Sequence, residues 1–79
     1  MIIEFHRGHI CLKVADKVVR IEGEALLPGH GSPDFVAYRN SLIRWEQPNG
    51  KLIDDEDKKI IEELLIIELT KKGMSVEFE

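Results

Sequence analysis

Hydrophobic and polar residues alternate along the first half of the chain. In residues 9–15, "HICLKVA", and in residues 18–24, "VVRIEGE", every second side chain is apolar. Alternation with a period of two predicts β-strands that bury one face. The inward positions are Ile10, Leu12, Val14, Val19 and Ile21. Asp16 and Lys17 are expected to form a two-residue hairpin loop between these strands.

Two further short segments, residues 35–39 and 42–46, are predicted to be strands or one bent strand. In the second, Ile43 and Trp45 would point the same way, and the large indole would fill the core. Pro48 would end this segment because proline cannot donate to a sheet ladder, and Asn49–Gly50 would supply a turn. Trp45 is therefore interpreted as a structural core marker.

The clearest pattern predicts a helix that begins at Asp55. Asp54 suits the N-cap, and the acids at 55–57 favour the positive end of the helix dipole. Lys71 and Lys72 suit the other end, and Gly73 fits the left-handed cap. The segment 74–79, "MSVEFE", then alternates as a final strand.

The helix is apolar on more than one side. At about 100° per residue, its core-facing arc is expected to hold Ile60, Ile61, Leu64, Leu65 and Ile67. Ile66 and Leu69 fall outside that arc, so either another segment covers them or they pack against a second copy of the chain. Glu68 projects into the arc, and we expect it to reach solvent or to meet an arginine.

These elements predict an α+β fold for residues 1–79 as a single domain. The expected architecture is a small antiparallel sheet of about five strands with one helix packed on one face, in the order β-β-β-β-α-β. The chain has 79 residues, of which 43% are hydrophobic and 33% charged, values typical of a globular protein. A chain this short holds one core of modest size.

Charge is unevenly distributed. Residues 1–40 carry five basic and five acidic residues, whereas residues 41–79 carry six basic and ten acidic, which accounts for the net charge of -4. An acidic half disfavours nucleic acid and favours a basic protein partner. The longest apolar run, residues 64–67, is too short for a membrane span. The N-terminus lacks the pattern of a secretory signal, and the single Cys11 agrees with a reducing compartment, so a cytoplasmic location is expected.

No convincing catalytic or metal site emerges from the sequence. In the loop 28–34, His30, Ser32 and Asp34 lie close together, but the strained pattern of a serine nucleophile is absent. His6 and His9 flank a predicted turn at Gly8, and their spacing relative to His30 does not support zinc geometry. We therefore expect no cofactor, no metal and no catalytic residue.

Three segments together resemble immunity protein family seventy-four of bacterial polymorphic toxin systems. They are "IRWEQP" at 43–48, "IDDEDKKIIEEL" at 53–64 and "KKGMSVEFE" at 71–79. The most specific positions are Trp45-Glu46, Pro48, Ile53-Asp54 and residues 76–79. The resemblance implies a cytoplasmic, non-enzymatic protein that binds and blocks a toxin domain.

An acidic inhibitor would be attracted to a toxin with a basic surface. The residues expected to contribute to such a partner surface are Tyr38, Arg39, Asp55, Glu56, Glu62 and Glu63. One alternative is a homodimeric structural or regulatory domain that self-associates through Ile66 and Leu69. A second is a small hydrolase that uses the 28–34 loop.

Overall fold

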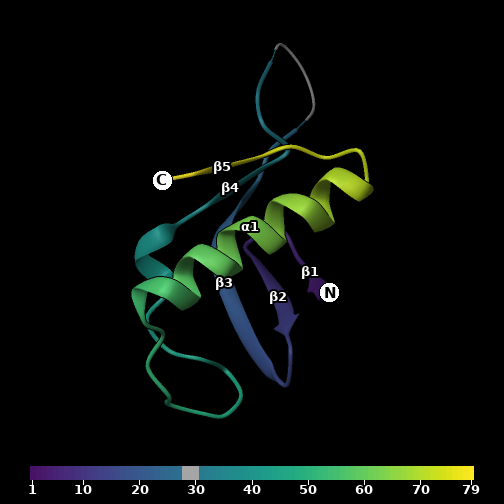
Figure 1. Ribbon diagram of the computed structural model, residues 1–79. Coiled ribbons are helices and arrows are strands. Elements are labelled where there is room, and N and C mark those ends of the chain that lie inside the picture. The colour runs from purple at the N-terminus through teal and green to yellow at the C-terminus, as the bar shows by residue number, and fades with distance from the viewer. Residues whose placement is uncertain (28–30) are drawn as a thin grey trace.

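The fold is a five-stranded sheet with one long helix across one face (Figure 1). The computed structural model describes residues 1–27 and 31–79. The strands are β1 (Ile2–Phe5), β2 (His9–Val14), β3 (Lys17–Ala25), β4 (Phe35–Ala37) and β5 (Val76–Phe78), and the helices are the 3₁₀ helix η1 (Arg39–Ser41) and α1 (Asp55–Lys71). The expected α+β class and the order β-β-β-β-α-β are confirmed.

The sheet is mixed, whereas the sequence pattern suggested an antiparallel one. Strands β1 to β4 pair antiparallel in the order β1-β2-β3-β4, and β5 adds to β4 in parallel. The chain between β4 and β5 contains α1, and a parallel pair needs such a long crossover connection. Alternation along one strand does not reveal the direction of its neighbour, so the pattern in 74–79 could not distinguish the two arrangements.

The β2–β3 hairpin turns one residue earlier than expected. Val14 pairs with Lys17, so the loop is Ala15–Asp16. Ala15 has a φ of 56°, whereas Lys17, the residue expected to be in the loop, is the first residue of β3. Its Nζ lies 5.1 Å from the centre of the Trp45 ring, which is a cation–π contact. This contact and the strand pairing both favour Lys17 in the sheet.

The predicted strand at 42–46 was wrong. After η1 the chain runs through an irregular segment in which a single bridge, Arg44 to Leu52, joins its two sides. The Ser41 hydroxyl donates to the Tyr38 carbonyl oxygen at 2.6 Å, which supports a helical turn in place of a strand. Trp45 is 2% exposed and belongs to the core, whereas Ile43 is exposed, so the two side chains do not share a face as expected.

The buried face of α1 matches the predicted one only in part, since Ile61 and Leu65 are in the core as expected. Ile61, Leu65 and Leu69, spaced four residues apart, are fully buried against the sheet, while Ile60 and Ile67 are exposed. The interpretation of Leu69 as a self-association residue was therefore wrong, because its side chain lies in the core. The apolar residues around the helix leave its orientation ambiguous in the sequence, and packing against the sheet decides it. The buried core consists of Ile10, Leu12, Val19, Ile21, Phe35, Ala37, Leu42, Trp45, Ile53, Ile61, Leu65 and Leu69.

Both ends of α1 are capped as predicted. The Asp54 carboxylate accepts a hydrogen bond from the Asp57 backbone N–H at 2.7 Å. At the other end Gly73 has a φ of 74°, and the N–H groups of Gly73 and Met74 donate to the carbonyls of Thr70 and Leu69. This bonding pattern is a Schellman motif. It reverses the chain into β5.

Candidate functional site

The outer face of α1 combines exposed isoleucines with acids. Glu56, Ile60, Glu63 and Ile67 recur at intervals of three and four residues and therefore form one stripe along the helix. Ile60 is 46% exposed and Ile67 51% exposed, and the neighbouring Ile66 is also exposed. Exposed apolar side chains that cluster on one face mark a candidate protein-binding surface. We call Glu56, Ile60, Glu63 and Ile67 the outer stripe.

Two of the expected partner-binding residues make internal contacts. The Arg39 Nε lies 3.3 Å from both carboxylate oxygens of Glu62, and its guanidinium lies 5.3 Å from the centre of the Phe78 ring. The Arg39 backbone N–H also donates to the Glu79 carbonyl oxygen. Arg39 thus links η1, α1 and the C-terminal segment, while its side chain stays exposed at the edge of the helix.

The other expected partner residues lie in two places. Asp55 and Glu56 are exposed in the first turn of α1, with Lys58 3.8 Å from Asp55, and Glu63 lies one residue beyond Glu62 on the exposed side. Tyr38 is half-buried just before η1. The acids therefore lie together on the first half of α1, and Arg39 marks its boundary.

Glu68 meets a lysine and the N-terminus in place of the expected arginine. Its carboxylate lies 3.1 Å from Lys71 Nζ and 3.9 Å from the Met1 ammonium. The hydrogen bond from Lys71 lowers the pKa of the Glu68 carboxyl below its usual value, although partial burial opposes this shift. The contact fastens the start of β1 to the helix.

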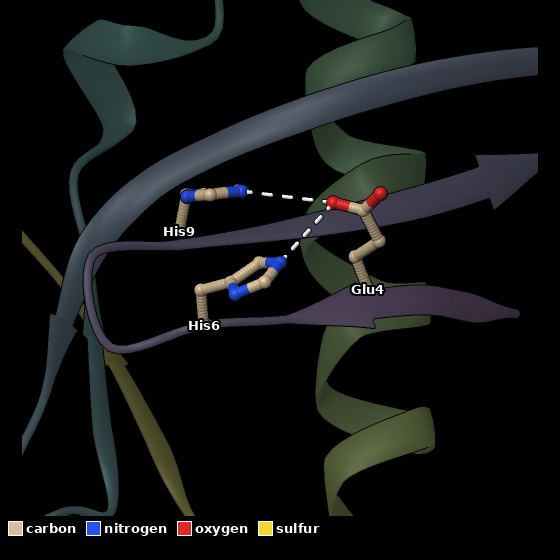
Figure 2. Close-up of side chains that lie close together, drawn as sticks. All are labelled: Glu4, His6 and His9. Carbon is tan, nitrogen blue, oxygen red and sulfur yellow. Dashed lines mark hydrogen bonds and ion pairs between the residues drawn. The ribbon is translucent and has the colours of Figure 1, made fainter.

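A second cluster lies at the end of the β1–β2 hairpin, where Glu4, His6 and His9 converge (Figure 2). One carboxylate oxygen of Glu4, Oε2, lies 3.3 Å from His6 Nε2 and 3.9 Å from His9 Nε2. The two imidazole rings are 4.6 Å apart between centres. Glu4 and His6 are more than half exposed, whereas His9 is largely covered.

A β-bulge makes this convergence possible. Ile2 pairs with Leu12 but Glu4 pairs with Cys11, so Ile3 is the extra residue in β1. Without the bulge, Glu4 would lie on the same face as Ile2, which packs against the core. The extra residue shifts Glu4 to the opposite, outer face, as bulges commonly do when they redirect a side chain.

The turn of the same hairpin supplies the two histidines. The His6 N–H donates to the His9 carbonyl oxygen at 2.8 Å across the two residues Arg7 and Gly8. His6, directly after β1, and His9, the first residue of β2, are therefore opposite each other across the hairpin, where side chains on one face come within contact distance. The sequence "HRGH" indicates this pair, because the two histidines flank a turn residue. No feature of the sequence indicates the bulge that brings Glu4 to them.

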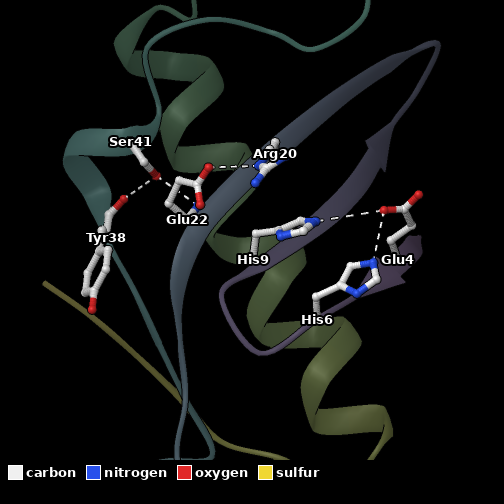
Figure 3. A network of polar contacts seen from close by, with 7 residues as sticks. All are labelled: Glu4, His6, His9, Arg20, Glu22, Tyr38 and Ser41. Carbon is white, nitrogen blue, oxygen red and sulfur yellow. Dashed lines mark hydrogen bonds and ion pairs between the residues drawn. The ribbon is translucent and has the colours of Figure 1, made fainter.

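Polar residues of β3 border the cluster (Figure 3). His9 pairs with Glu22 in the strand register, and the Glu22 carboxylate is bound by Arg20 Nε at 2.8 Å. The Glu22 N–H donates to the Ser41 hydroxyl, which connects the sheet to η1.

The thiol of Cys11 in β2 stays protonated at neutral pH. Its pKa is raised, first by burial and then by the nearby Glu4 carboxylate.

The loop considered for catalysis is described only in part. His30 lies outside the described residues, and Ser32 is exposed. The Asp34 carboxylate accepts from the Ser75 backbone N–H at 2.8 Å, so it joins this loop to the segment before β5.

Within residues 1–27 and 31–79, no helix is long and apolar enough to cross a membrane.

Comparison with known protein families identifies the chain. A family model described as immunity protein 74 matches residues 2–79. The chain belongs to the immunity protein 74 family. No curated protein and no solved structure matches it. The match covers the outer stripe, the Arg39–Glu62 contact and the Glu4, His6 and His9 cluster.

Proposed function

We propose that this protein neutralises a bacterial toxin domain by binding to it directly in the cytoplasm, without catalysis. The observation that carries the proposal is the match of residues 2–79 to an immunity protein family. Toxins of polymorphic systems would be the targets. The exposed surface of α1 supports this function because it has the composition of a binding face.

The outer stripe is the proposed contact surface. Exposed isoleucines such as Ile60 and Ile67 would bury apolar area in the complex, and Glu56 and Glu63 would pair with basic groups of the toxin. Residues 54–63 hold six acids and two lysines. A second copy of the chain would bring like charges together, so a partner with a basic surface fits this face better.

The test begins with capture of the partner by the tagged protein from its source, with identification by mass spectrometry. The captured domain is then produced and purified, and its binding is measured by surface plasmon resonance. Replacing both isoleucines, Ile60→Ser and Ile67→Ser, should weaken binding by tenfold or more, which corresponds to about 1.4 kcal/mol, mainly through faster dissociation.

The charge contribution is tested with matched pairs of variants. Glu56→Gln with Glu63→Gln should slow association at low salt, because attraction between opposite charges accelerates encounter. The control is Glu24→Gln with Glu77→Gln, which removes the same charge from exposed acids on the strands. Equal effects of the two pairs, or no effect of the isoleucine variants, would contradict the proposed surface. A captured domain that does not bind the purified protein would contradict the function itself.

A further inference from the structure

The Glu4, His6 and His9 cluster has the donors of a metal site and lies away from the outer stripe. Its imidazole and carboxylate atoms lie within 4.8 Å of one another. Two imidazoles with one carboxylate are a ligand set that zinc uses in proteins, whereas magnesium and calcium prefer oxygen ligands alone. We propose that Glu4, His6 and His9 bind a divalent transition-metal ion, with zinc the best fit. This inference does not depend on toxin binding.

The distances are close to those that coordination requires. Zinc bonds of about 2.0–2.1 Å in tetrahedral geometry place two ligand atoms about 3.3 Å apart. Glu4 Oε2 and His6 Nε2 are already 3.3 Å apart, and Glu4 Oε2 and His9 Nε2 are 3.9 Å apart. All three ligand atoms lie within 4.8 Å of one another, and the side chains of Glu4 and His6 are exposed and therefore free to adjust around an ion.

The backbone holds these donors in place before any ion arrives. The bulge at Ile3 fixes Glu4 on the outer face, and the short turn fixes His6 opposite His9. Placement on a short hairpin, with Glu4 in β1, His9 in β2 and His6 directly after β1, reduces the ordering cost of binding compared with a long loop. The nearby Glu22 is already engaged by Arg20, so the donors that converge here are those of Glu4, His6 and His9.

A Co²⁺ titration of the full-length protein in neutral buffer tests the site. Co²⁺ bound by imidazole and carboxylate ligands absorbs visible light, so binding can be followed directly. We expect one Co²⁺ per chain, displaced by Zn²⁺ but not by excess Mg²⁺. Each of the variants Glu4→Gln, His6→Gln and His9→Gln should weaken Co²⁺ binding at least tenfold. Even the loss of a residue that only hydrogen-bonds to a metal ligand lowers metal affinity by about 10–100-fold.

Two control variants separate this site from other metal-binding groups. His30→Gln also removes a histidine but keeps all three donors, and Cys11→Ser removes the thiol of the residue that pairs with Glu4 in the strand register. Both should bind Co²⁺ like the unmodified protein. Absence of a visible spectrum, or equal loss of binding in either control, would overturn the proposal. Circular dichroism of every variant verifies that it is folded.

Discussion

Among the glycines that the structure describes, Gly23 leaves the least room for a side chain. It lies in β3 opposite Ala37 of β4, where the buried Phe35 ring packs closely over the backbone. A Cβ atom added at Gly23 would lie 2.6 Å and 2.7 Å from two atoms of the Phe35 ring and would also collide with the Val36 carbonyl oxygen. The change Gly23→Ala therefore forces the β3–β4 pair apart or displaces a core ring.

The cost can be estimated from the size of the clash. Overpacking a core by a methyl group costs about 1–3 kcal/mol, whereas a domain of this length has a total stability of about 4–12 kcal/mol. Each kcal/mol lowers the melting temperature by about 4–8 °C in a domain of this size. We expect Gly23→Ala to lower the melting temperature by about 5–20 °C, measured by circular dichroism.

Gly8→Ala is the matched control for this prediction. The chemical change is the same, but a Cβ at Gly8 would meet no atom within 4 Å, and its backbone does not have a positive φ. Its melting temperature should stay within a few degrees of the unmodified protein. If Gly23→Ala melted no lower than Gly8→Ala, the close packing of Phe35 against β3 would be refuted.

Three further changes test other parts of the fold. Ala15→Gly should stabilise the protein by about 0.5–1 kcal/mol, because glycine relieves the positive φ of the β2–β3 loop; a higher urea midpoint would verify this, and a lower one would contradict it. Trp45→Ala should cost about 3–5 kcal/mol, because it empties a buried site; an unchanged urea midpoint would show that the indole is not in the core. The lowered pKa of Glu68 should add stability that is complete above its usual pKa of 4.5 and is lost as the pH falls through the lower value of the folded state. Urea midpoints measured at decreasing pH should therefore decline less in Glu68→Gln, and parallel declines would exclude this role.

Local chemistry was sufficient to predict several elements from the sequence. The helix was predictable because Asp54 and Gly73 each satisfy backbone groups at an end of α1. The strands β2 and β3 were predictable because one face of each is buried and the other is not. For α1 the deciding interactions lie within a few residues of one another in the chain, and for β2 and β3 the alternation within each segment records which face is buried.

Features that depend on distant contacts could not be predicted in this way. Leu69 and Ile67 are both apolar helix residues, and only packing against the sheet shows that Leu69 is buried and Ile67 exposed. The bulge at Ile3 arises from pairing between β1 and β2, so no pattern in the sequence indicated that Glu4 joins His6 and His9. Part of the proposed partner surface was predicted, since the acids of α1 are adjacent in sequence, but the outer isoleucines were assigned to the core.

The central claim, direct neutralisation of a toxin, is tested most directly by growth rescue. The toxin domain captured with this protein is expressed in a laboratory bacterial host, alone, with the unmodified protein, or with the variant Ile60→Ser, Ile67→Ser. We expect the toxin domain to stop growth, the unmodified protein to restore it, and the folded variant to restore it less well. Growth that stays arrested with the unmodified protein, although both proteins are produced, would contradict the account.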